Sequence, residues 1–182
     1  VRGFGDRFEQ VSVDEAYLDV TERVRGDFKE AHILAKQIKD EILRREGLTC
    51  SVGVEPNKLV AKVAANWKKP DGLTVVSPDD VKAFLHPLPV GRLRGVGRKT
   101  ESVLLDMGVK TIGDLAVYPL EKLFAVFGKV LGTYFHRAAD GIDDSVVQEK
   151  EGPKSMSRIT TLKTNTRSPE ILHMTLKELC KH

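Results

Sequence analysis

Two acidic residues stand side by side in an otherwise apolar stretch, VSVDEAYLDV, at residues 11–20. Strand-forming or small apolar residues flank the pair on both sides. Because neighbouring residues on a regular strand point to opposite faces, one of the two carboxylates would face the core, where an unpartnered charge is too costly to keep. A turn at Asp14 and Glu15 lets both carboxylates converge on one point. The sequence therefore predicts strand, turn and strand over residues 8–20, with the acids at or near the turn.

Converging carboxylates repel and raise each other's pKa unless a cation lies between them. Hard oxygen ligands of this kind suit Mg²⁺, which binds one or two carboxylates and completes its shell with substrate phosphates. The alternative is that Asp14 and Glu15 are solvated charges at a hairpin tip. That alternative is favoured on the dipeptide alone, because short motifs often match by chance. The apolar flanks argue against a generic polar loop.

A second candidate site is the stretch GVGRKT at residues 95–100. Glycines at positions 95 and 97 let backbone N–H groups approach a phosphate closely at a helix start. The pattern L-x-G-V-G-x-x-T-x-x-x-L-x-x-x-G is typical of a helix-hairpin-helix, which holds a DNA backbone without reading bases. A lone G-x-G, by contrast, is usually a tight turn. The local positive charges are Arg92, Arg94, Arg98 and Lys99.

Lysines mark a third stretch, KLVAKVAANWKKPDG, at residues 58–72. Lys58 and Lys62 lie one helical turn apart and fit a plain solvated helix face. Lys69 differs because Pro70 ends the helix directly after it and so fixes where its ammonium can reach. A lysine fixed beside a metal site can hold a triphosphate. In isolation, the solvated face remains the favoured interpretation of these lysines.

The elements that must position these residues alternate up to residue 85. The apolar spacing predicts helices and strands, with Gly47 ending the first helix and Ser77-Pro78 opening the last. This alternation predicts an α/β layer. The expected elements are a helix over 31–45, a strand over 48–54, a helix over 57–67, a turn over 69–72, a strand over 73–76 and a helix over 79–85.

The alternation of strands and helices stops after HPLP at residues 86–89. From 90 to 139 the pattern predicts only short helices punctuated by glycines, one of them opened by a capping box of Thr111 and Asp114. The polar stretch QEKEGPKS (148–155) is expected to be a linker. A strand over 155–162 and a helix over 168–180, capped by Ser168, would then begin a further domain.

Composition sets the remaining bounds. The 182 residues are 41% hydrophobic and 30% charged, with a net charge of +3 and a pI of about 8.8. These values are typical of a globular chain and are compatible with a polyanionic partner without demanding one.

No apolar run is long enough to span a bilayer and no signal peptide is visible, so a cytoplasmic protein is expected. Cys50 and Cys180 show no metal-binding spacing and are expected to be buried thiols in a reducing compartment. The chain does not begin with Met, and its last helical pattern has no cap, which suggests a fragment cut at both ends.

Taken together, four stretches resemble Y-family translesion DNA polymerases, in the DinB or DNA polymerase IV-like branch. They are SVDEAYLD, SVGVEPNKLVAKVAANWKKPDG, LRGVGRKTESVLLDMGVKTIGDL and KSMSRITTL, in that order and spacing. The resemblance covers nearly the whole chain. It implies an α+β protein with a partial palm, a small all-helical thumb containing the helix-hairpin-helix, and the beginning of an α+β little-finger domain. The corresponding ranges are 1–85 for the palm, 86–147 for the thumb, 148–155 for the linker and 156–182 for the little finger.

The resemblance also implies roles for individual residues. Asp14 and Glu15 would bind catalytic Mg²⁺ in a two-metal site, and Lys69 would contact the incoming triphosphate. The residues expected to contact DNA are Ser12, Lys62, Gly95, Val96, Gly97, Arg98, Lys99 and Arg158. The family carries a further catalytic Asp on its first palm strand, and a fingers domain, neither of which this sequence contains.

The expected function is therefore metal-dependent nucleotidyl transfer from a deoxynucleoside triphosphate to a primer 3′-OH, in error-prone bypass of damaged DNA. The expected partners are primer–template DNA and the nucleotide, with a sliding clamp as a further candidate, no membrane, and a monomeric chain. The fragment alone is expected to be inactive. The alternative is a non-catalytic DNA-binding module built on the helix-hairpin-helix.

Overall fold

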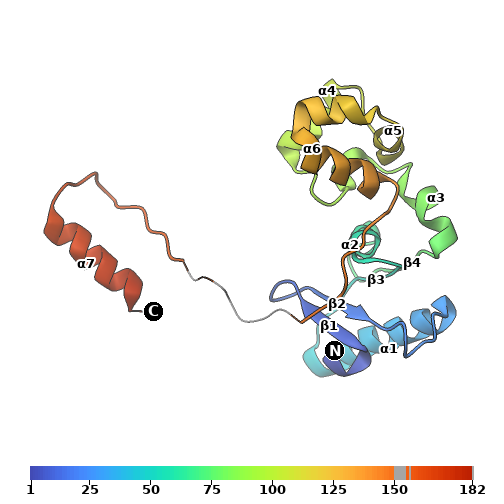
Figure 1. Cartoon of the computed structure of the whole chain (residues 1–182). Coiled ribbons are helices and arrows are strands. Elements are labelled where there is room, and N and C mark those ends of the chain that lie inside the picture. Colours follow the sequence, from blue (N-terminus) through green and yellow to red (C-terminus); the bar gives the residue numbers. More distant parts are fainter. Residues whose placement is uncertain (150–154, 156, 182) are drawn as a thin grey trace. The chain divides into compact units, whose positions relative to one another are not determined.

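The computed structural model of the chain describes residues 1–149, 155 and 157–181. The chain divides into two compact units, Val1–Glu149 and Lys150–His182. Figure 1 shows two groups of elements within the first unit, one built from β1–β4 with α1 and α2, the other from α4–α6. The described elements are η1 (Arg2–Phe4), β1 (Arg7–Gln10), β2 (Ala16–Asp19), α1 (Phe28–Glu46), β3 (Val52–Val54), α2 (Lys58–Trp67), β4 (Leu73–Val75), η2 (Pro78–Asp80), α3 (Val81–Leu85), η3 (Val90–Arg92), α4 (Arg98–Asp106), α5 (Ile112–Ala116), α6 (Leu120–Ala139) and α7 (Pro169–Cys180), where η denotes a 3₁₀ turn.

The strands form two small sheets. β1 pairs antiparallel with β2, from Arg7 opposite Asp19 to Gln10 opposite Ala16, so the predicted hairpin is confirmed. β3 pairs parallel with β4. The expected single layer is therefore two separate two-stranded sheets over the described residues. The strand predicted over 48–54 is shorter than expected, because only its last three residues bond to β4.

Helix α1 ends at the predicted Gly47 stop but begins at Phe28, three residues before the predicted range. Asp27 caps the start, its side chain accepting a hydrogen bond from the Lys29 N–H. Gly47 ends the helix with a φ of 67°, a left-handed conformation that glycine adopts without strain. Ala31, Ala35 and Ile38 form its buried face.

Helix α2 is the predicted lysine-bearing helix, and it packs closely on β3. The Asn57 side chain caps it by accepting a hydrogen bond from the Val60 N–H at 3.0 Å. The predicted apolar face is buried. Close packing depends on Gly53 of β3, where a Cβ would come within 2.5 Å of the Ala61 carbonyl oxygen. The helix that carries Lys58 and Lys62 is thereby fixed against the sheet.

One buried cluster extends from α2 through α3 into the helical group of α4–α6. The predicted capping box of Thr111 and Asp114 is present at the start of α5. Gly128, with φ 75° and ψ 167°, is not helical and divides α6 into two shorter helices, so the expectation of short helices punctuated by glycines is confirmed there. The first helix of the predicted helix-hairpin-helix is only the 3₁₀ turn η3.

In the second unit, α7 confirms the predicted C-terminal helix, and Ser168 caps it by accepting from the Ile171 N–H. The strand predicted over 155–162 is wrong for the residues described there, which form no regular element. A strand needs a bonded neighbour, and none of the described strands pairs with this segment. Most of the predicted linker lies outside the described residues.

The structure bears on two expectations, the burial of the cysteines and the absence of a membrane-spanning helix. Both cysteines are free; Cys50 is partly buried, but Cys180 is exposed, so the expected burial is wrong for Cys180. The helices of the described chain are all too short or too polar to cross a membrane.

Candidate active site and nucleic-acid interface

The turn between β1 and β2 places both acids at the tip of the hairpin. The N–H groups of Val11 and Ser12 donate to the Glu15 carbonyl oxygen, at 2.9 and 3.2 Å, and so close the loop. The Ser12 hydroxyl donates to the Asp14 carboxylate at 2.5 Å. The side chain of Val13 is almost fully exposed, at 97%. The two carboxylates therefore avoid the core, as the sequence predicts.

Asp14 is exposed, and its pKa lies below the ordinary value. The main cause is the hydrogen bond from Ser12, followed by one from its own backbone N–H, and the charges of Lys69 and Lys62 lower the pKa further. Asp14 is therefore an ionised carboxylate at neutral pH, with two cations close enough to act on it.

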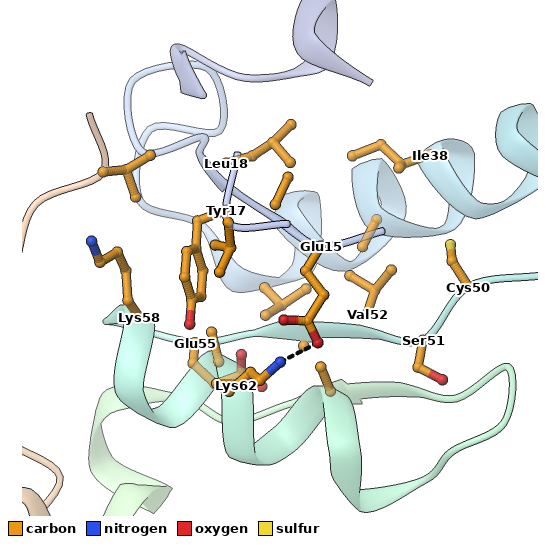
Figure 2. Close-up of a pocket in the computed structure, with 18 of the residues that line it drawn as sticks. Glu15, Tyr17, Leu18, Ile38, Cys50, Ser51, Val52, Glu55, Lys58 and Lys62 are labelled. Carbon is orange, nitrogen blue, oxygen red and sulfur yellow. Dashed lines mark hydrogen bonds and ion pairs between the residues drawn. The ribbon is translucent and has the colours of Figure 1, made fainter. Parts of the chain in front are cut away.

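Glu15 forms an ion pair with Lys62 of α2, drawn as a dashed line in Figure 2. Lys58, one turn earlier, bonds to the Glu9 carboxylate at 2.8 Å, and the side chain of each is only 12% exposed. The solvated-face interpretation is therefore wrong for Lys58, and Lys62 is engaged with a predicted metal ligand.

A cavity of about 1040 Å³ opens beside the hairpin tip. It is bounded by the hairpin, α1, β3 and α2, and Asp14, Glu15, Lys62 and Lys69 all line it. Figure 2 shows Glu15 and Tyr17 entering it from the hairpin and Lys62 from α2. The structure thus brings together the acids and the lysine predicted to hold a triphosphate.

The donor set fits a hard divalent cation in part. Asp14 and Glu15 offer adjacent carboxylate oxygens, the ligand type that Mg²⁺ prefers. No group of three or more His, Cys, Asp or Glu suited to a metal occurs within the described parts of the chain. The two acids therefore supply part of an oxygen shell, and phosphate oxygens and further carboxylates would have to supply the rest.

Lys69 also lines a smaller cleft of about 490 Å³, which connects the end of α2 with η3. Trp67, Gly91 and Arg92 line it as well. Among the described residues, no acidic side chain forms an ion pair with Lys69 or Arg92. The charged side chains that line this cleft, Lys69 and Arg92, are therefore both positive.

Glu55 lines the large cavity and was not predicted as a site residue. Both of its carboxylate oxygens are buried without a hydrogen-bond partner that meets normal geometry. Burial raises its pKa to about 8, although the backbone of Val54 partly offsets the effect. A Cβ on Gly53 would lie 2.8 Å from one of its oxygens, so the glycine leaves room for the carboxylate. The signal in the sequence that could have indicated Glu55 was an isolated acidic residue between a buried strand and a helix cap.

The glycine hairpin precedes α4, as predicted. Val96 is buried, and its N–H donates to the Leu93 carbonyl oxygen, so the predicted DNA contact of Val96 has no open donor at the surface. Gly97 is the N-cap of α4 and no side chain caps the helix there, which leaves its first-turn N–H groups open. Gly95, Gly97, Arg98 and Lys99 are exposed. The hairpin therefore presents backbone donors beside two cations.

The remaining predicted DNA contacts lie elsewhere. Ser12 is exposed at the hairpin tip, where it bonds to Asp14. Arg158 is exposed in the second unit. The structure thus groups Ser12 and Lys62 with the acids, and Gly95, Val96, Gly97, Arg98 and Lys99 at the glycine hairpin.

Comparison with known proteins found matches along most of the chain. Residues 1–66 match the profile of the impB/mucB/samB family, and residues 91–143 match that of the DNA polymerase-iota thumb domain. The chain is 49% identical over 175 residues to DNA polymerase IV of Methanosarcina acetivorans, covering 96% of this chain and 48% of that protein. It is 51% identical over 173 residues to DNA polymerase IV of Methanoculleus marisnigri, covering 95% of this chain and 47% of the relative. The chain spans about half the length of these curated relatives.

Solved structures agree. A chimera described as Y-family DNA polymerase Dbh-Dpo4(243-245)-Dbh is 34% identical, with a TM-score of 0.85, over 98% of this chain and 52% of that one. An insertion ternary complex of Dbh DNA polymerase is also 34% identical, with a TM-score of 0.77 and the same coverage. The described fold is therefore the fold of the corresponding half of these proteins.

Proposed function

The chain belongs to the Y family of DNA polymerases, in the branch of DinB and DNA polymerase IV, and from that membership we propose that it forms part of a translesion DNA polymerase. Residues 1–85 would be the later part of the palm, 86–147 the thumb, 148–155 a linker and 156–182 the start of the little finger. The substrates would be primer–template DNA and a deoxynucleoside triphosphate. The observation that supports this most directly is the hairpin tip, where Asp14 and Glu15 face a cavity that Lys69 also lines.

In this proposal each residue of the site has a distinct task. Asp14 and Glu15 would hold Mg²⁺, which when bound lowers the charge repulsion between the primer 3′-oxygen and the triphosphate. The Ser12 hydroxyl keeps Asp14 ionised and oriented. Lys62 neutralises the Glu15 carboxylate. A bound metal ion would take over that role, and the phosphates of the nucleotide would then offer Lys62 a new partner. Lys69 would bind the triphosphate as a point charge.

The thumb hairpin would hold the DNA. Open N–H groups at the start of α4 are suited to phosphate oxygens, while Arg98 and Lys99 add positive charge. Such contacts position a duplex without reading its bases, as a polymerase that accepts every template sequence requires. The further ligands of the metal site are proposed to come from the half of the relatives that this chain does not cover.

A chimeric polymerase tests the proposal. This chain would replace the corresponding region of the Methanosarcina acetivorans relative, and primer extension would be measured with Mg²⁺. We expect extension by the chimera and none by the isolated chain, because phosphoryl transfer depends on a complete, positioned metal site.

Asp14→Ala in the chimera should abolish extension while leaving the melting temperature nearly unchanged, since the side chain is exposed at the hairpin tip. The matched control is Asp40→Ala on α1, an exposed acid outside the cavity, which should extend normally. Extension by Asp14→Ala at the rate of the parent chimera would contradict the catalytic role of the acids. DNA binding without extension by the chimera would favour the non-catalytic binding module.

A further inference from the structure

The glycine hairpin rests on a tyrosine from another helix. Tyr134 lies in the second half of α6, and its hydroxyl donates a hydrogen bond of 2.8 Å to the carbonyl oxygen of Arg94. Its ring lies directly beneath the next residue, because a Cβ on Gly95 would come within 2.9 Å of the ring atom Cε1. Gly95 also has a φ of 89°, which side-chain-bearing residues rarely adopt. Tyr134 and Gly95 therefore fit together as one unit.

This contact determines where a backbone donor points. The Arg94 carbonyl and the Gly95 N–H belong to the same peptide plane, in which C=O and N–H point in opposite directions. Because the Tyr134 hydroxyl holds the carbonyl on the inner side of the hairpin, the Gly95 N–H is directed away from α6. Gly95 is exposed, and no acceptor for its N–H exists among the residues described. The hairpin therefore presents the Gly95 N–H to solvent in a fixed direction, without an acceptor among the described residues.

The tyrosine is suited to hold this bond. Its side chain is half-buried against the core of the helical group. Burial raises the pKa of the hydroxyl above its ordinary value, so the group remains a protonated donor throughout the physiological range. Other half-buried tyrosines need not do the same: Tyr118, in the same helical group, packs on the core without a hydrogen bond to the described chain.

We propose that Tyr134 is a positioning residue for DNA, which fixes the Arg94–Gly95 peptide so that the Gly95 N–H binds a backbone phosphate. The inference rests on the proposed DNA-binding function of the hairpin and extends it to a residue that never touches the DNA. The ligand group is a phosphodiester oxygen, which would accept a hydrogen bond from a neutral backbone N–H rather than from a charged side chain.

Binding measurements at several salt concentrations test the role. Fluorescence anisotropy of a labelled primer–template duplex would be measured with the wild-type chain, Tyr134→Phe, the control Tyr118→Phe, and Arg98→Gln. Loss of the Tyr134 hydroxyl should weaken binding by about two- to tenfold, the range expected for one hydrogen bond. The slope of log Kd against log salt should not change, because a neutral N–H releases no counterion. Arg98→Gln should instead lower that slope by about one unit.

A site-specific readout separates positioning from general loosening. In ¹H–¹⁵N spectra the Gly95 amide resonance should shift strongly when DNA is added to the wild-type chain and only weakly in Tyr134→Phe. The melting temperatures should agree within a degree or two, since Phe keeps the ring packing. Equal DNA affinity of wild type and Tyr134→Phe would overturn this inference alone. A wild-type chain that binds no DNA would overturn the proposed function of the hairpin, and this inference with it.

Discussion

Of the residues that the structure describes, Glu55 is the one whose ionisation changes most on folding, because its carboxylate is buried. Its folded-state pKa of about 8 lies above the ordinary value of 4.5 because burial penalises the charged form. The folded state therefore retains a proton that the unfolded chain loses between these two values. Unfolding free energy should fall as the pH rises through this window, by up to about 1.4 kcal/mol for each pH unit.

Replacing that acid should remove the pH dependence. We expect Glu55→Gln to raise the melting temperature relative to wild type, with a gain that grows from pH 5 to pH 8. For a chain of this size, 1 kcal/mol corresponds to about 2–4 °C. Glu46→Gln, at the exposed end of α1, serves as the control and should show no such trend. A gain of equal size at pH 5 and pH 8 would contradict the burial of the charge.

Lys69 should act on the nucleotide rather than on the DNA. It lines the same cavity as Asp14, and after the larger effect of the Ser12 hydrogen bond its positive charge helps to lower the pKa of that acid. In the chimeric polymerase, Lys69→Ala should raise the KM for nucleotide about tenfold or more, the loss expected for a bond to a charged group. Lys68→Ala is the matched control, since Lys68 lines neither cavity. A weaker DNA affinity with normal nucleotide kinetics would make Lys69 a backbone contact.

At the scale of elements, the two glycines of the hairpin differ in whether their positions can accept a side chain. Gly97 has an ordinary φ of −88°, and a Cβ there meets nothing within 4 Å. Gly97→Val should therefore fold, but its branched side chain would stand before the open N–H groups of α4. We expect DNA binding to weaken severalfold while the melting temperature changes little.

The matched control for that variant is Gly3→Val, another glycine whose Cβ position is open but which lies outside the hairpin. It should bind DNA normally. Gly95→Val, in contrast, should lower stability markedly, because of its positive φ and the Tyr134 ring. DNA binding by a folded Gly97→Val variant at wild-type affinity would remove the hairpin from the interface.

The elements that the sequence predicted well are those whose signals are local. The glycine stop of α1, the capping box at Thr111 and the apolar face of α2 each depend on residues within a few positions. The hairpin tip was predictable for the same reason, since two adjacent acids cannot both remain on a half-buried strand.

What the sequence could not predict depends on distant partners. Whether a strand forms over 155–162 depends on a neighbouring strand, and the division into two sheets depends on what lies beside β3. Glu55 is buried only because Gly53 leaves it room. The contact between Tyr134 and Arg94 joins residues 40 positions apart, and no spacing rule indicates it.

At the scale of the whole first unit, the chain returns from the helical group toward β1 and α2, where hydrogen bonds fasten residues 141–148. The Asn57 side chain donates to the Gly141 carbonyl at 2.8 Å, and the Leu59 N–H donates to Asp143 at 3.0 Å. Lys58 reaches the Val146 carbonyl at 3.0 Å as well as Glu9. The buried ion pair thus joins β1, α2 and the returning segment 141–148.

Breaking this ion pair should destabilise the unit more than breaking an exposed one. Glu9→Gln would leave the Lys58 ammonium buried with incomplete neutralisation, and we expect a loss of about 1–3 kcal/mol in denaturant unfolding. Glu41→Gln, which removes exposed pairs with Arg44 and Arg45 on α1, should lower the unfolding free energy distinctly less. Equal losses for the two variants would contradict a structural role for the Glu9–Lys58 pair.

The returning segment has a mechanical consequence. The helical group is joined to the group of β1–β4, α1 and α2 through α3, against which Gly141 packs closely, and is fastened again by the bonds of residues 141–148. A body held at two points can turn only about the line that joins them, and here the buried core also continues between the two groups. We therefore expect the glycine hairpin to keep a fixed orientation relative to the hairpin that carries Asp14 and Glu15.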